Sequence, residues 1–107
     1  MKPPPRRGAV WVARLPPPAG ARPVVIITRD TALPYLTNVT VVPVTRTIRG
    51  IPSEVPIGPA EGLKVDSVAS CDNIMTIPSE LLVTQIGILG PALLRRLSAA
   101  IRLAVDV

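Results

Sequence analysis

Proline is the feature that most constrains the fold of this chain, because fourteen of its 107 residues are proline, well over twice the average usage of about 5%. Proline has no backbone N–H and a fixed φ, so it breaks helices and cannot donate to the hydrogen-bond ladder of a paired strand. Prolines occur at 3–5, at 16–18 and singly elsewhere. These positions therefore punctuate strands and shape loops, and they leave room for only one long helix.

Between the prolines, short runs rich in β-branched residues predict strands. Several short strands separated by turn signals indicate a mainly β (α+β) domain built as a small barrel or a curved antiparallel sheet. Tyr35 falls outside these runs, in a predicted loop or single turn at 31–37. The predicted strands are Ala9–Arg14, Pro23–Thr28, Val39–Val44, Ser53–Ile57, Ser67–Ile77 and Thr84–Leu89.

The one predicted helix follows Gly90-Pro91, since proline is tolerated in a first helical turn. Apolar residues recur there with helical spacing and form a single stripe that would face the core. The core itself must be aliphatic, because the only aromatic residues are Trp11 and Tyr35. The stripe is Leu93, Leu94, Leu97, Ala100, Ile101 and Ala104, and the residues expected to face outward are Arg95, Arg96, Ser98 and Arg102.

The chain length allows one compact domain, since domains usually span about 50 to 250 residues. We expect residues 1–6 to be a mobile proline-rich tail and residues 7–107 to form the domain. The single Cys71 cannot form an intrachain disulfide, and the N-terminus lacks the apolar stretch of a secretory signal. No run approaches the roughly 18 apolar residues of a membrane span. The sequence thus predicts a soluble, cytoplasmic protein without a membrane partner.

Charge is distributed unevenly along the chain, whose formal net charge is +5. Residues 1–29 hold six Lys or Arg and no acid, whereas residues 51–80 hold five acids and Lys64 alone. Clustered cations attract phosphates and release condensed counterions on contact, which favours a polyanionic partner. A solvated basic surface explains the same pattern equally well.

The residue inventory excludes many kinds of active site. The chain has no histidine, which rules out Ser-His-Asp and Cys-His arrangements and histidine-based zinc sites. It has one cysteine, neither of the glycine-rich motifs GxxxxGK[ST] and GxGxxG, and no two acids within four positions of each other. We therefore expect no cofactor and no metal site.

Arginine and hydroxyl chemistry remain. Arg22-Pro23 opens one apolar run and Thr45 closes another, and a strand end can hold a side chain in place while exposing it to a ligand. An arginine there can bind phosphate oxygens as a planar cationic donor, and a threonine hydroxyl can bind the same phosphate. The alternative is that both residues merely complete strand ends.

Several segments together resemble the MazF/PemK toxins, the mRNA interferases of type II toxin–antitoxin systems. Their order and spacing fit that family from about Arg7 to Val105. The segments are Arg7-Gly8-Ala9-Val10-Trp11, Arg22-Pro23-Val24-Val25-Ile26-Ile27, Val41-Val42-Pro43-Val44-Thr45, Ser67 to Ile77, Ile86-Gly87-Ile88-Leu89 and the leucine-rich C-terminal stretch.

The resemblance implies an SH3-like barrel with a C-terminal helix, a homodimer, and a MazE-like acidic antitoxin as partner. It implies cleavage of single-stranded RNA by the ribose 2′-OH, which leaves a 2′,3′-cyclic phosphate or 3′-phosphate and a 5′-OH. The family's catalytic residues fall on Arg22 and Thr45, and a base-reading polar residue falls on Asn73. The loop after Thr45 and the end of the first strand add further candidate RNA-binding residues, which are Arg14, Arg46, Thr47 and Arg49.

Two departures from the family pattern leave the general base unassigned. Ala9 replaces the acid of the Arg-Gly-Glu motif, and the loop at 15–21 is short and has no acid. Two other functions stay open on the sequence alone. One is a non-enzymatic toxin like the CcdB relatives that bind DNA gyrase, and the other is a basic RNA-binding barrel without catalysis.

Overall fold

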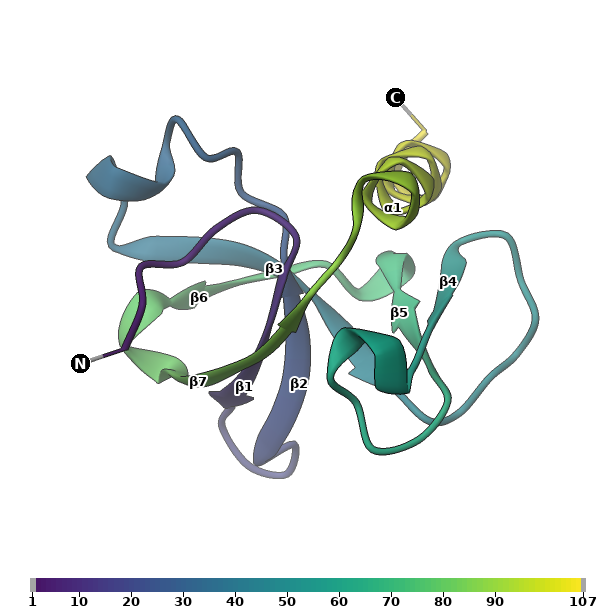
Figure 1. The fold of residues 1–107 in the computed structure, drawn as a ribbon, viewed down its shortest axis with the longest axis horizontal. Coiled ribbons are helices and arrows are strands. Elements are labelled where there is room, and N and C mark those ends of the chain that lie inside the picture. Colours follow the sequence, from purple (N-terminus) through teal and green to yellow (C-terminus); the bar gives the residue numbers. More distant parts are fainter. Residues whose placement is uncertain (1, 107) are drawn as a thin grey trace.

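A computed structural model describes residues 2–106 of the chain. Over these residues the chain forms a seven-stranded sheet followed by one α-helix (Figure 1). Four short 3₁₀ turns join the strands, at Leu33–Tyr35, Pro59–Glu61, Cys71–Asn73 and Ser79–Leu81. The regular elements are β1 Ala9–Arg14, β2 Ala21–Ile26, β3 Asn38–Thr45, β4 Glu54–Ile57, β5 Ser67–Ser70, β6 Met75–Pro78, β7 Leu82–Ile88 and α1 Pro91–Val105.

The sheet is antiparallel throughout and runs in the order β4-β5-β3-β2-β1-β7. Strand β3 is long enough to change partners: its first half pairs with β6 and its end pairs with β5. Within residues 2–106, β4 and β7 end the sheet without pairing with each other. The predicted mainly β fold is confirmed, as an open, curved antiparallel sheet with a C-terminal helix.

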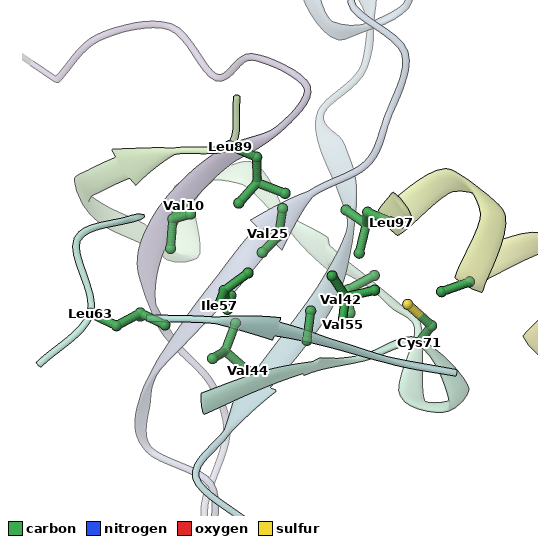
Figure 2. Close-up of a cluster of buried hydrophobic side chains, with 12 residues drawn as sticks. Val10, Val25, Val42, Val44, Val55, Ile57, Leu63, Cys71, Leu89 and Leu97 are labelled. Carbon is green, nitrogen blue, oxygen red and sulfur yellow. The ribbon is translucent and has the colours of Figure 1, made fainter. Parts of the chain in front are cut away.

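Each face of the sheet carries a buried apolar cluster, and one strand can contribute to both clusters because its side chains alternate between the two faces. In β1, Val10 joins the core cluster on the α1 side, whereas Trp11 joins the cluster on the opposite face. Strands β2 and β3 alternate in the same way, as Val24 and Val25 illustrate. Figure 2 shows the α1-side cluster, in which Leu97 from the helix packs over valines from the strands. The core is aliphatic apart from Trp11, as the composition predicts.

The prediction of one strand over Ser67–Ile77 is wrong. The segment forms β5 and β6, separated by the 3₁₀ turn Cys71–Asn73. Asp and Asn are unfavourable in strands and favour turns, and Asp72 and Asn73 stand together at the break. Asp72 also accepts a hydrogen bond from the Ser53 hydroxyl, which fixes the turn against the start of β4. This break lets β3 pair with β6 and then with β5 on one edge.

Strand boundaries otherwise differ by up to two residues from the predicted ones, and β1 matches its prediction. The largest shift is in β2, which begins at Ala21 and therefore includes Pro23. Pairing of β2 with β3 starts only at Val24, so the missing N–H of Pro23 falls where the strand has a single neighbour, the position that proline tolerates.

Helix α1 begins at Pro91, and its buried residues Leu97 and Ala100 lie on the predicted apolar stripe. It packs against β4 and the 3₁₀ turn Cys71–Asn73. Ser98 was expected to face solvent, but it is half-buried, and its hydroxyl lies 3.1 Å from Nη2 of Arg7, which donates to it. Arg7 also donates to the Ile27 carbonyl, so one guanidinium ties the start of the domain to the helix.

The segment before β1 also contacts the body of the domain, because the Lys2 ammonium donates to the Leu82 carbonyl. Tyr35 lies in the 3₁₀ turn Leu33–Tyr35, as predicted, and is 85% exposed. None of the helices in the described part of the chain is both long enough and apolar enough to cross a membrane.

Candidate active site

Arg22 and Thr45 lie at open ends of neighbouring strands. Arg22 is the second residue of β2 and stands opposite Ala13 of β1, beyond the stretch that pairs with β3. Thr45 ends β3 and stands opposite Val68 of β5. The apolar runs that follow Arg22 and precede Thr45 are buried in the sheet, so both residues are attached to rigid backbone while their side chains reach the surface.

Two cavities open beside this pair. The loop cavity, about 400 Å³, lies on the side of the β3–β4 loop, and the lysine cavity, about 510 Å³, lies on the side of Lys64. Arg22 and Thr45 line both cavities. The polar residues of the loop cavity are Arg22, Thr45, Thr47, Arg49, Glu54, Ser70 and Asn73, and those of the lysine cavity are Arg22, Thr45, Arg46, Lys64 and Ser67.

The Arg22 guanidinium is oriented by its own hairpin. Its Nε donates to the Ala19 carbonyl at 3.0 Å. Within residues 2–106 the two terminal amino groups make no hydrogen bond, so they are free for the paired donation that suits a phosphate. The residue is exposed, and its anchored Nε restricts how the guanidinium can turn.

The Thr45 hydroxyl is oriented by the loop that follows it. Its Oγ1 accepts the N–H of Thr47 at 3.1 Å. A hydroxyl has one hydrogen to donate and two lone pairs, so this contact occupies a lone pair and leaves the O–H free to donate. Arg22 and Thr45 thus both have hydrogen-bond donors available to an anion bound beside them in either cavity.

Six of the seven site residues predicted from the sequence line one or both cavities. Thr47, Arg49 and Asn73 belong to the loop cavity and Arg46 to the lysine cavity. The Asn73 amide Nδ2 donates to the Ser70 hydroxyl at 2.8 Å. Arg14, by contrast, lies exposed at the end of β1 and lines neither cavity.

Sequence reasoning missed four polar residues of the cavities, namely Glu54, Lys64, Ser67 and Ser70. Glu54 is the acid that lines the loop cavity. The charge pattern held one signal for it, because Glu54 is the first acid after the basic loop that contains Arg46 and Arg49. In the described part of the chain, no three His, Cys, Asp or Glu side chains are grouped as a metal ion would require.

Known proteins resemble the chain over nearly its whole length. Residues 6–105 match the family of PemK-like, MazF-like toxins of type II toxin–antitoxin systems. Endoribonuclease MazF3 of Mycobacterium tuberculosis is 49% identical over 87 residues, which cover 81% of this chain and 84% of that protein.

Two solved structures are similar in fold. The Mycobacterium tuberculosis toxin MazF-mt6 superposes with a TM-score of 0.86 at 45% identity, covering 92% of this chain and 97% of that one. An endoribonuclease from a mycobacterial species, solved in complex with its cognate antitoxin, superposes with a TM-score of 0.85 at 29% identity and covers 96% of each chain. The chain therefore belongs to the family of PemK-like, MazF-like toxins of type II toxin–antitoxin systems.

Proposed function

We propose that this toxin is an endoribonuclease that cleaves single-stranded RNA, with Arg22 and Thr45 as its catalytic residues. The observation that carries the proposal is that the Arg22 and Thr45 side chains line both cavities. A phosphate bound to these two residues could therefore have one flanking nucleotide in each cavity. The 49% identical relative is named an endoribonuclease, which supports the same reaction class.

In the proposed mechanism the ribose 2′-oxygen attacks the adjacent phosphorus and the bond from phosphorus to the 5′-oxygen breaks. The 2′ proton passes to a base, and the leaving 5′-oxygen takes up a proton. The products are a 2′,3′-cyclic phosphate, which can hydrolyse to a 3′-phosphate, and a 5′-OH. Arg22 stabilises the charge that develops on the phosphate oxygens, and Thr45 donates its hydroxyl hydrogen to one of them.

The remaining site residues are proposed to hold the RNA. Arg46 and Arg49 give the two cavities cationic donors for flanking phosphates, and Thr47 and Asn73 offer polar groups to a base or ribose. Arg14 lies outside both cavities, so its proposed role is limited to attracting the RNA strand over a longer distance through its charge.

The similar proteins also inform the proposed partners of the toxin and the choice between endoribonuclease activity and the two alternative functions. We propose that the toxin acts in the cytoplasm as a homodimer and is inhibited by an acidic, MazE-like antitoxin, since one similar structure contains an endoribonuclease with its cognate antitoxin. The gyrase-binding and non-catalytic alternatives are less well supported, because the relatives are named endoribonucleases.

Incubation of the purified protein with RNA, followed by mapping of the new ends, tests the proposal. We expect 5′-OH ends and cyclic or 3′-phosphate ends, with cleavage unaffected by excess EDTA because the attacking hydroxyl belongs to the RNA itself. Replacing the ribose 5′ of the scissile phosphate with deoxyribose should abolish cleavage. Cleavage that is lost with EDTA and restored by magnesium would contradict the mechanism, and intact RNA would contradict the function.

A further inference from the structure

The loop at residues 46–50, between β3 and β4, carries three of the proposed RNA-binding residues but has little packing to hold it. All five of its residues are exposed, and its one large apolar side chain, Ile48, is 57% exposed. Such a loop is mobile unless hydrogen bonds restrain it. A mobile loop would lose conformational freedom on binding RNA, and that loss would weaken binding.

Hydrogen bonds restrain the loop at both ends. At its start, Thr47 N donates to Thr45 Oγ1 at 3.1 Å. At its other end, Glu54 Oε1 accepts the N–H groups of both Arg49 and Gly50, each at 2.9 Å. Gly50 has a φ of +73°, a backbone conformation in which glycine lets the chain turn back toward the carboxylate.

Glu54 is itself well anchored. It is half-buried as the first residue of β4, where it stands opposite Ser70 of β5, and its own N–H donates to the Ile51 carbonyl at 3.0 Å. The Ser70 hydroxyl accepts the Asn73 amide. Glu54 therefore connects the loop to the paired strands β4 and β5, whose Ser70 also lines the loop cavity.

A carboxylate in this cavity opposes the proposed substrate, because its negative charge repels phosphate. The contacts of the Glu54 carboxylate indicate a function that offsets this repulsion. Both lone pairs of Oε1 are accounted for by the two N–H donors, and this points to the loop backbone as the group on which Glu54 acts.

We propose that Glu54 is a positioning residue that holds residues 46–50 in the conformation that presents Thr47 and Arg49 to RNA. This inference rests on the proposed function, since it assigns Glu54 a part in binding the same substrate. The proposed role is to hold the loop, and the kcat of Glu54→Met distinguishes this role from that of a general base.

The test compares Glu54→Gln, which keeps an oxygen acceptor, with Glu54→Met, which has similar length but no comparable acceptor. For cleavage of a short single-stranded RNA, we expect Glu54→Met to raise KM about tenfold or more, the cost of ordering a freed loop, with kcat within about threefold. Glu54→Gln should stay within about threefold of wild type in both constants because the amide oxygen still accepts the loop N–H groups.

Amide hydrogen exchange, followed by NMR, reports on the restraint itself. The N–H groups of Arg49 and Gly50 should exchange faster in Glu54→Met and at nearly wild-type rates in Glu54→Gln. Glu80→Ala provides the control, because it removes the same charge from an exposed position that lines neither cavity. It should leave KM, kcat and both exchange rates unchanged. If circular dichroism shows Glu54→Met to be unfolded, Glu54→Ala replaces it.

The outcomes separate the two proposals. Wild-type protein that leaves RNA intact overturns the proposed function, while the exchange rates still test the restraint. If the wild-type protein cleaves RNA and Glu54→Met has the same KM as wild type, the positioning role is overturned and the proposed function stands. A Glu54→Gln variant as defective as Glu54→Met also overturns it, because the charge and not the acceptor would then be essential.

Discussion

Within residues 2–106, the Arg22 and Thr45 side chains are each held by one hydrogen bond, and the groups that would meet a phosphate make none. Arg22 is held through Nε and Thr45 through a lone pair on Oγ1. Preorganised donors stabilise developing charge without having to reorient during the reaction. The contribution of each residue to cleavage should therefore be much larger than its contribution to stability.

We expect Arg22→Ala and Thr45→Ala each to lower cleavage by about 10²-fold or more, the range found when a donor that stabilises the transition state is removed. Initial rates on a short RNA measure the loss, and circular dichroism checks the fold. Arg95→Ala serves as the control, since Arg95 is exposed on α1 and lines neither cavity. A comparable loss in this helix variant would show that the site has been misplaced.

Cys71 is a buried residue whose environment keeps its thiol protonated. Burial, and secondarily the negative charge of Asp72, raises its pKa from 9.0 to about 11. The unfolded chain ionises this thiol near pH 9 while the folded chain does not. The stabilisation from the neutral buried thiol is therefore constant below pH 9 and is lost as the pH rises from 9 to 11.

The difference in unfolding free energy between wild type and Cys71→Ala should thus be flat up to pH 9 and shrink between pH 9 and 11. Urea denaturation at fixed protein concentration measures it, and the difference removes the titration of other residues. Thiol reagents at pH 8 should modify the folded protein only as fast as it opens, since the thiolate is the reactive form. Rapid modification of the folded state at pH 8 would show that the thiol is accessible.

At the scale of elements, a close backbone contact joins Gly62, which lines the lysine cavity, to strand β7. The backbone of β7 crosses the end of the 3₁₀ turn Pro59–Glu61 so closely that neither side tolerates a side chain. A Cβ built on Gly87 would lie 1.9 Å from the Glu61 carbonyl oxygen, and one on Gly62 would lie 1.9 Å from the Ile86 carbonyl oxygen. Glycine is required at both positions because the obstructing atoms are backbone.

Gly87→Ala should accordingly lower the free energy of unfolding by about 3 kcal/mol or more, at or above the upper end of the usual cost of overpacking. Gly90→Ala is the matched control, because nothing lies within 4 Å of a Cβ there, and it should cost no more than about 1 kcal/mol as a helix N-cap change. Urea denaturation measures both. Equal effects of the two substitutions would mean that the two backbones separate easily.

At the scale of the whole molecule, the two cavities share Arg22 and Thr45, and we expect the proposed acidic inhibitor to bind over both of them. Arg22, Arg46 and Arg49 line these cavities. An acidic segment with apolar anchors would imitate the spacing of phosphates there and fold as it binds. Inhibitor and RNA would then compete for one surface.

Titrating the antitoxin against toxin bound to an RNA with deoxyribose at the scissile position should therefore displace the RNA. Association should slow as salt rises, because steering between exposed charges is screened, while dissociation changes little. Fluorescence anisotropy of the labelled RNA measures the displacement and, followed over time at several salt concentrations, the rates. A stable ternary complex with unchanged RNA affinity would place the inhibitory surface elsewhere.

The sequence by itself determined the elements whose signals are local. The alternation of apolar residues in β1 and the helical spacing after Pro91 act over a few residues, so β1 and α1 were predictable. Arg22 and Thr45 each stand at the end of an apolar run, which left open whether they merely complete strand ends, and the resemblance to the MazF/PemK toxins made them candidate site residues.

Tertiary structure decided what depends on distant pairing. Asp72 and Asn73 favour a turn locally, but the break of Ser67–Ile77 into two strands also depends on the hydrogen bond between Ser53 and Asp72 and on the partner change of β3. Glu54 shares the loop cavity with Arg22 and Thr45 because β4 pairs with β5 and β5 with β3. Strand register fixes which side chains share a cavity, and register follows from the burial of both sheet faces rather than from any short segment.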